Sequence, residues 1–222
     1  MQDETLRQVA VLFDPQQMTL HYRAGNAVDD DNEESRVIVQ YLADGSNDQL
    51  LTLATAQSNA DRPQTAVSVH EVYRRVLEDF FPLAERKHID IGVESIEDVQ
   101  VILNETDLLI LVRNLVDNAI RYTPHGGRID LSVERVQEAA TLQVKDSGPG
   151  ITAEEQSRVF DPVYRCLGTD EAGSGLGLSI VKAIADRTGT RVRLSYADEV
   201  NKRGLYVSVE LKQASVGAPA QG

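Results

Sequence analysis

The chain has 222 residues, of which 41% are hydrophobic and 26% are charged, and this composition is typical of a globular protein with a buried core. Its net charge of −13 excludes broad surfaces for nucleic acid or anionic membranes, because such surfaces are basic. The single cysteine, Cys166, excludes an intramolecular disulfide and fits a reducing compartment. An acidic start, with no aliphatic run longer than Leu108–Val112, predicts a cytoplasmic chain, although the full-length protein could be anchored in the inner membrane.

Residues 1–57 predict two helices joined by an acidic turn. In the first segment, apolar residues follow helical spacing before Pro15 interrupts them: Leu6, Val9, Leu12 and Phe13. The run "DDDNEES" then precedes a second apolar stripe that ends near Gln57. Two helices alone bury little surface, so we expect this hairpin to form a homodimer. Residues 58–64 are expected to be a linker.

Helical and strand patterns alternate from residue 65 to residue 212. Helical spacing of apolar residues covers 69–84, 107–122 and 178–186. The strand patterns lie in 88–93, 99–104, 127–135, 140–146, 191–197 and 204–211. The small and polar residues 213–222 are expected to be a disordered tail.

Three glycines alternate with other residues directly before the last helix, at Gly173, Gly175 and Gly177. A glycine loop that enters a helix N-terminus can bind an anion such as phosphate, because free backbone N–H groups and the helix dipole point the same way. A flexible linker is the alternative. The dinucleotide motif would need glycine at Leu178 or Ile180, and no Gly-Lys pair is present for a Walker loop.

The helix over 107–122 places three polar side chains on one face. Asn114, Asn118 and Arg121 occupy positions i, i+4 and i+7. An asparagine oxygen suits Mg²⁺, which takes most of its ligands from phosphates and water. A solvated helix surface is the alternative for such a set.

The segment "LQVKDSGPGI" ends a predicted strand at Asp146 and turns through Gly148 and Gly150. A carboxylate accepts hydrogen bonds only, so Asp146 suits the exocyclic amine of adenine and disfavours guanine, which presents an oxygen there. The glycines would let a purine approach the backbone. An ordinary Pro-Gly turn is the alternative.

Together these segments resemble a known family. "LVRNLVDNAIRYTP", "DSGPGI", "RVFDPVYR" and "GSGLGLSIVKAIA" are similar, in order and spacing, to the N, G1, F and G2 boxes of sensor histidine kinases. These kinases belong to the gyrase–chaperone–histidine kinase–MutL (GHKL) ATPase superfamily. The resemblance covers about 65–212. It implies an α/β (α+β) sandwich in which helices cover one face of a mixed sheet, preceded by an α-helical hairpin.

The resemblance also implies roles for individual residues. Asn118 would be the main Mg²⁺ ligand with Asn114 in support, and Asp146 would hold adenine. The remaining ATP-binding residues would be those on the phosphates, in the turn and in a hinged lid: Arg121, Tyr122, Gly148, Gly150, Ile151, Arg165, Gly173, Ser174, Gly175, Leu176, Gly177 and Leu178. Val163 departs from the family, because an aromatic residue is usual there.

The implied reaction is transfer of the γ-phosphoryl group of ATP to a histidine, for relay to the aspartate of a response regulator. The family's acceptor pattern, similar to H-E-L-R-T-P, is not recognisable here. His21 is followed by neither acid nor proline, and His70 is followed by Glu71 but by no proline. A weak alignment on "AVLFDP" puts Ala10 in the acceptor position. A non-enzymatic ATP-binding switch and a gyrase-like ATPase therefore stay open, although the latter needs a glutamate where Asn114 stands.

Overall fold

The protein is described here by a computed structural model that covers residues 9–14, 19–24, 47–57, 62–95, 97–137, 139–162, 164 and 175–214. The chain divides into two compact units, Met1–Ser58 and Asn59–Gly222, and each is considered by itself. No helix within these described ranges is long and apolar enough to cross a membrane.

In the first unit, the expectation of a first helix is wrong. Strands β1 (Val9–Asp14) and β2 (Thr19–Ala24) pair antiparallel, so the proposed register that puts Ala10 on a helix fails as well. The physical reason is that β-branched and aromatic residues alternate along β1, and a short apolar run fits period two as well as helical spacing. Of the second expected helix, α2 (Asn47–Gln57) is present, and its earlier part lies outside the described residues.

The second unit contains a mixed sheet of five strands in the order β4-β6-β7-β9-β8. The strands are β4 (Asp90–Val93), β6 (Arg128–Val136), β7 (Ala139–Asp146), β8 (Arg191–Asp198) and β9 (Arg203–Lys212). Only the β4–β6 pairing is parallel among these described strands. A separate antiparallel pair joins β3 (Thr65–Ser68) to β5 (Gln100–Leu103), and β3 was not expected from the sequence.

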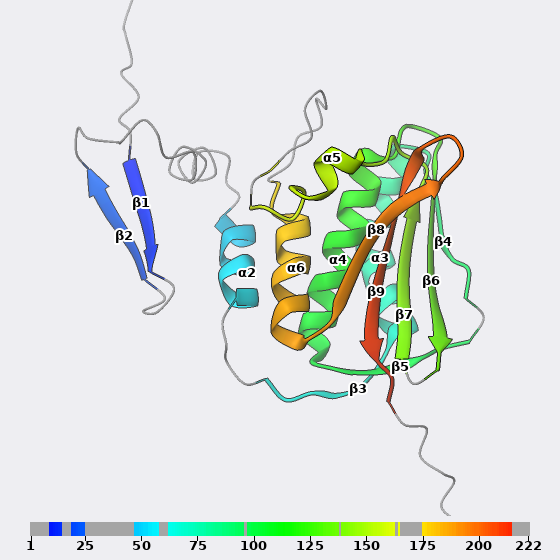
Figure 1. The fold of residues 1–222 in the computed structure, drawn as a ribbon, viewed down its shortest axis with the longest axis horizontal. Coiled ribbons are helices and arrows are strands. Elements are labelled where there is room, and N and C mark those ends of the chain that lie inside the picture. The colour runs from blue at the N-terminus through cyan, green and yellow to red at the C-terminus, as the bar shows by residue number, and fades with distance from the viewer. Residues whose placement is uncertain are drawn as a thin grey trace, which may run out of the picture. The chain divides into compact units, whose positions relative to one another are not determined.

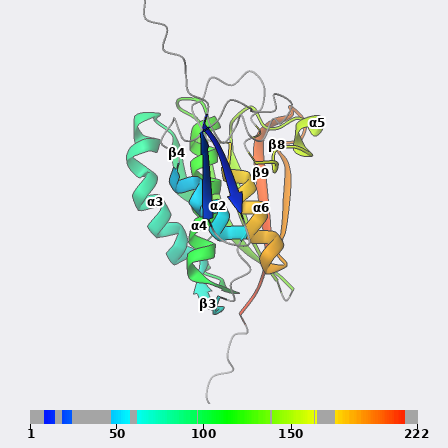
Figure 2. The same ribbon diagram turned by 90° about the vertical axis from the view of Figure 1, so that its left-hand side faces the viewer.

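Three long helices cover one face of this sheet (Figures 1 and 2). They are α3 (Val69–Arg86), α4 (Glu105–Tyr122) and α6 (Gly177–Thr188), and a short helix, α5 (Ala153–Gln156), lies between β7 and α6 in the chain. The expected α/β sandwich, with a mixed sheet and helices on one face, is therefore confirmed for this unit.

The core lies between the sheet and the helices because each element presents one apolar face. Along β6 and β7 alternate residues are buried, while their neighbours face the open side of the sheet. On α4 the buried residues recur with helical spacing. These core residues are Ile129, Leu131, Val133, Ala140, Leu142 and Val144 on the strands, and Leu108, Leu111, Val112, Leu115 and Val116 on α4.

The end of the chain differs from the expected disordered tail over 213–222. Gln213 forms a bridge with Val101, and the Ala214 N–H donates to the Gln100 carbonyl at 2.8 Å. Ala214 is also buried. The tail prediction is therefore wrong for these two residues. Their backbone pairs with β5, and such pairing does not depend on the size of the side chains. Residues 215–222 lie outside the described residues.

Candidate functional site

Two asparagines of α4 have different surroundings. The Asn114 side-chain Nδ2 donates to the Ile110 carbonyl at 2.8 Å, and its Oδ1 lies 3.5 Å from where a Cβ on Gly177 would stand. Asn118 is half-buried and has no hydrogen-bond partner among the described residues. The start of α6 thus lies beside Asn114, and the predicted role of Asn118 as a metal ligand stays a prediction.

The C-terminal end of α4 is fixed by a lysine from the loop that follows α3. Lys87 Nζ donates to the carbonyls of Ile120 and Arg121, at 3.0 and 2.8 Å. A cation at a helix C-terminus neutralises the partial negative charge of unpaired carbonyls. Arg121 itself binds Asp117 through Nε at 2.8 Å, so its predicted contact with phosphate stays a prediction.

Asp146, at the end of β7, is buried and has one oxygen occupied. Its Oδ1 accepts the backbone N–H groups of Gly148 at 2.8 Å and Leu205 at 3.1 Å. The other oxygen has no partner among the described residues. Burial raises the pKa of Asp146 to about 6, and the two backbone hydrogen bonds partly oppose that rise. The result is an oriented carboxylate with one free acceptor oxygen, which fits an exocyclic amine.

The glycines around Asp146 are needed because the backbone is tightly packed. Gly150 has a φ of +79°, and a Cβ there would lie 2.8 Å from the ring of Tyr196. Gly204, with a φ of +69°, would place a Cβ 2.2 Å from the Asp146 carbonyl oxygen. A Cβ on Gly148 would meet the carbonyl at the end of α4 at 2.7 Å. The turn is therefore formed where three chain segments approach one another closely. The participation of Tyr196 from β8 and Gly204 from β9 was not predicted from the sequence.

The start of α6 has the geometry of a glycine turn that enters a helix. Gly175 has a φ of +70°, and Leu176 takes the N-cap position without a side-chain hydrogen bond to the first turn. Uncapped N–H groups at a helix N-terminus favour negative charge. Of the other predicted lid residues, Arg165, Gly173 and Ser174 lie outside the described residues, as does Val163.

The structure brings together three of the predicted segments. The turn at Gly148 reaches the backbone of Tyr122 at the end of α4, and Gly177 meets Asn114 along the same helix. Ile151 and Leu178 are buried next to these segments in the chain, and their predicted contact with ATP stays a prediction. The arrangement has an amide and a carboxylate oxygen without partners among the described residues, beside a helix start that no side chain caps, and this suits a nucleotide with phosphates.

Of the two histidines named as possible acceptors, His70 is not part of this cluster, and His21 lies in the first unit. His21 lies in β2, opposite Leu12. His70 is in the first turn of α3, with its Nε2 2.8 Å from Ser95 Oγ and its backbone N–H bound to Asp98. These contacts anchor the start of α3, which is the role expected of a helix-terminal polar residue.

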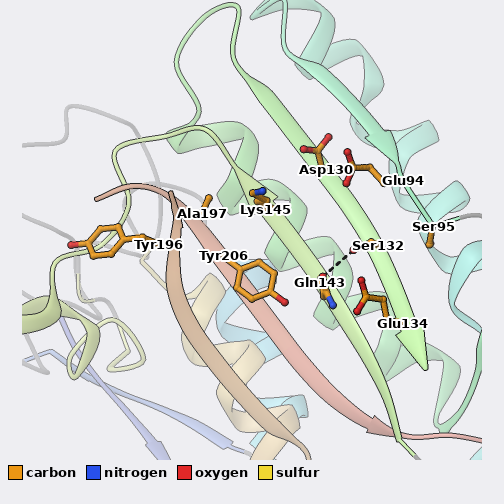
Figure 3. A pocket seen from close by; sticks show the side chains of 10 residues that line it. All are labelled: Glu94, Ser95, Asp130, Ser132, Glu134, Gln143, Lys145, Tyr196, Ala197 and Tyr206. Atoms are coloured by element: carbon orange, nitrogen blue, oxygen red, sulfur yellow. Dashed lines mark hydrogen bonds between the residues drawn. The ribbon is translucent and has the colours of Figure 1, made fainter. Parts of the chain in front are cut away.

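A separate depression of about 520 Å³ lies on the open face of the sheet (Figure 3). Its lining is polar, and side chains from neighbouring strands bind one another there, as Ser132 Oγ does with Gln143 Oε1 at 3.1 Å. Asp130 is held by Arg128 at 2.6 Å. The helices that carry the asparagines cover the opposite face, so this depression is not part of the candidate site.

Comparison with known families shows to which family the chain belongs. The family model described as "Histidine kinase-, DNA gyrase B-, and HSP90-like ATPase" matches residues 103–215, from the end of β5 past the end of β9. The chain belongs to this family. The expected resemblance is therefore confirmed, and the second unit is the catalytic ATP-binding domain of a sensor histidine kinase.

Curated relatives are sensor proteins. The "Swarming motility regulation sensor protein RssA" of Serratia marcescens is 31% identical over 169 residues, which are 75% of this chain and 35% of RssA. "Sensor protein kinase PmrB" of Pseudomonas aeruginosa is 36% identical over 180 residues, which are 79% of this chain and 37% of PmrB. The chain thus spans little more than a third of the length of these relatives.

Solved structures of the family are also similar. The "Mycobacterial sensor histidine kinase MprB" is 32% identical with a TM-score of 0.60, over 68% of this chain and 97% of that one. Full-length ShkA "in complex with AMPPNP" is 25% identical with a TM-score of 0.66, over 85% of this chain and 41% of ShkA. The MprB match is short enough to lie within the second unit, whereas the ShkA match covers more residues than that unit contains.

The raised pKa of Asp146 predicts that nucleotide affinity depends on pH. Adenine needs the carboxylate form, and in the free protein this form is lost as the pH falls through about 6. We expect affinity to be nearly constant above pH 7 and to fall about fivefold between pH 6 and pH 5. Titrations of a non-hydrolysable ATP analogue at several pH values measure this, with Asp146→Asn as the comparison because phosphate titration affects both proteins equally. Parallel pH profiles for the two proteins would contradict the prediction.

Proposed function

We propose that this chain is the ATP-binding and phosphoryl-transferring part of a sensor histidine kinase. The observation that carries the proposal is Asp146, whose Oδ1 is fixed by two backbone N–H groups and whose second oxygen is left for adenine. Family membership implies ATP, and the similar ShkA was solved in complex with AMPPNP. In this proposal Asp146 selects adenine, while the open start of α6 receives phosphate charge.

We further propose Mg²⁺ as the metal partner of the nucleotide. No group of three or more His, Cys, Asp or Glu side chains that could hold a metal occurs in the described part of the chain. Mg²⁺ keeps water and phosphate ligands and needs few protein oxygens, so one amide oxygen of the protein is enough. Asn118 would supply that oxygen, and Asn114 would hold α6 in place beside it. The bound metal would neutralise charge on the transferred phosphoryl group.

The residues of the chain would act mainly by positioning and charge. Asn118 and the first turn of α6 orient the phosphates, and Asp146 fixes the base at the other end of the nucleotide. No residue in this set is a general base for water: the Asn114 carboxamide cannot accept a proton and its Nδ2 is bound to Ile110. Transfer to a histidine supplied to the site therefore fits better than ATP hydrolysis. A response regulator would be the final recipient, and a homodimer is the proposed assembly.

The direct test of the proposed function is phosphoryl transfer to an acceptor added in trans. The chain is incubated with γ-labelled ATP, Mg²⁺ and a separate helical hairpin that carries the family's H-E-L-R-T-P acceptor pattern. Acid-labile, base-stable label on that hairpin is the expected result. Label that appears only as free phosphate would instead support an ATPase, and nucleotide binding without any transfer would support a non-enzymatic switch.

The same assay without an added acceptor yields a separate prediction. We expect no histidine label on this chain, because His21 lies in a strand and His70 is bound to Ser95 at the start of α3. A nucleophile must reach near-attack distance from the phosphorus, and an imidazole held elsewhere loses that advantage. Peptide mapping of the labelled chain checks the result. Stoichiometric phosphohistidine at position 21 or 70 would show that the assignment of these two residues is wrong.

A further inference from the structure

A buried carboxylate lies at the opposite end of α4 from Asn118. Asp107 is 1% exposed, and two arginines contact its Oδ1. Arg62 Nη1 lies at 2.6 Å and Arg187 Nη2 at 2.7 Å. A buried charge is stable only when it is paired, so the two guanidinium groups are required partners of this carboxylate.

The three members of this ion cluster come from different parts of the second unit. Asp107 is in the first turn of α4, and Arg187 is in the last turn of α6. Arg62 belongs to the leading segment, which we define as residues 62–64, directly before β3. The cluster therefore connects the leading segment to both α4 and α6, the two helices of the candidate site.

A second contact holds the leading segment on α4. The Pro63 carbonyl accepts a hydrogen bond from Asn104 Nδ2 at 3.1 Å. Asn104 is the N-cap of α4, and its Oδ1 accepts the N–H groups of Thr106 and Asp107. One asparagine thus ties the leading segment to the helix start, and the antiparallel pairing of β3 with β5 follows immediately.

The ion cluster and the nucleotide residues share one helix pair. Asn114 and Asn118 lie about two and three turns after Asp107 on the same face of α4. Helix α6 packs beside α4 in the opposite direction, with Gly177 near Asn114 and Arg187 on Asp107 (Figures 1 and 2). One end of the pair carries the predicted ATP site, and the other end carries the cluster.

We propose that Arg62 is a positioning residue that couples docking of the leading segment to nucleotide binding. Its ion pair with Asp107, together with that of Arg187, sets how α4 lies against α6. The position of α4 against α6 also sets how Asn118 faces the start of α6. The docked leading segment and the bound nucleotide would therefore stabilise the same position of α4 against α6. Two events that favour the same arrangement favour each other by equal factors. This inference rests on the proposed function, because it assumes a nucleotide between α4 and α6.

The test compares the unaltered chain with Arg62→Gln. This variant keeps a long polar side chain and leaves Asp107 paired with Arg187, so the fold should persist. Arg113→Gln is the matched control, because it also removes an arginine ion pair that involves α4. That ion pair, between Arg113 on α4 and Asp79 on α3, is exposed. Hydrogen exchange of the amides in residues 62–68 is measured with and without a Mg²⁺-bound non-hydrolysable ATP analogue, and calorimetry gives the affinity for that analogue.

For Arg62→Gln we expect exchange in residues 62–68 to be about tenfold faster without nucleotide, because the leading segment opens more often. The analogue should slow this exchange in the unaltered chain and less in the variant, and its affinity should fall about three- to tenfold. Arg113→Gln should match the unaltered chain in all three measurements. A purely structural role would accelerate exchange or lower the unfolding midpoint while leaving the affinity unchanged.

Equal affinities of Arg62→Gln and the unaltered chain would overturn the coupling while leaving the proposed function intact. Unchanged exchange in residues 62–68 of the variant would overturn the anchoring role itself. If the unaltered chain does not bind the analogue, the proposed function fails and the coupling fails with it. Faster exchange together with weaker binding, in Arg62→Gln but not in Arg113→Gln, supports the proposal.

Discussion

Replacement of Asn118 by alanine is expected to remove Mg²⁺-dependent ATP binding from an otherwise folded protein. The Asn118 amide is half-buried on α4 and has no partner among the described residues, so its loss breaks no described contact. Without the amide oxygen, the metal would lose its direct protein ligand. We expect an affinity loss of about 100-fold or more in the presence of Mg²⁺. Without Mg²⁺, the variant and the unaltered chain should bind equally weakly.

The control for this prediction is Asn201→Ala. Asn201 is an exposed turn residue that binds Asp198 in the β8–β9 connection. Its replacement should leave both the affinity and its Mg²⁺ dependence unchanged. Asn118→Asp is a second variant, expected to bind less tightly because an added negative charge faces the phosphates. Normal Mg²⁺-dependent affinity in folded Asn118→Ala would remove Asn118 from the metal site.

Asp146→Asn is expected to weaken ATP binding and, at the same time, to stabilise the protein. An amide in place of the free carboxylate oxygen presents N–H groups to the adenine amine, so one charged hydrogen bond is lost. The expected loss is about 1–3 kcal/mol of binding free energy. The oxygen of the introduced carboxamide could still accept the N–H groups of Gly148 and Leu205, so the turn should be retained.

The stability gain follows from the direction of the pKa shift. Burial raises the pKa of Asp146 from 3.8 to about 6, so the folded protein binds this proton more tightly than the unfolded chain does. The resulting cost to stability is absent below about pH 4, grows as the pH rises to about 6 and is constant above that. At neutral pH it is about 3 kcal/mol, and we expect Asp146→Asn to recover about 1–3 kcal/mol of it.

Denaturant unfolding of the nucleotide-free protein at pH 4 and pH 7 measures this effect. The difference between Asp146→Asn and the unaltered chain should be larger at pH 7. Asp130→Asn, on the open face of β6 and paired with Arg128, is the matched control and should show no such gain. Destabilisation of Asp146→Asn at pH 7 would contradict the expected stability cost of the buried carboxylate. Normal ATP binding by this variant would contradict the role of Asp146 in binding adenine.

The parts of the fold that the sequence predicted are those with a regular local pattern. Helix α4 and strands β6 and β7 alternate buried and exposed residues over several turns or strand positions, and the structure confirms them. The first segment failed because Val9–Asp14 is a short apolar run, and a run of that length cannot distinguish a strand period from a helical one.

Within the candidate site, the residues on motifs were predictable and their partners were not. Asn118 and Asp146 stand in recognisable spacings, but Lys87, Tyr196 and Gly204 reach the site from distant parts of the chain. Nothing in the local pattern around Lys87 or Tyr196 indicates their contacts. Gly204 is the one with a usable signal, since glycine within a strand often marks a close backbone approach.

The proposed function requires that an adenine nucleotide with Mg²⁺ binds between α4, the Asp146 turn and the start of α6. Calorimetric titration of the chain with a non-hydrolysable ATP analogue, and with the matching GTP analogue, is the decisive test. We predict that each chain binds one ATP analogue, tightly only with Mg²⁺. The GTP analogue should bind about tenfold or more weakly, because the guanine oxygen would face the Asp146 carboxylate. No binding of the ATP analogue, or equal binding of the two analogues, would contradict this assignment.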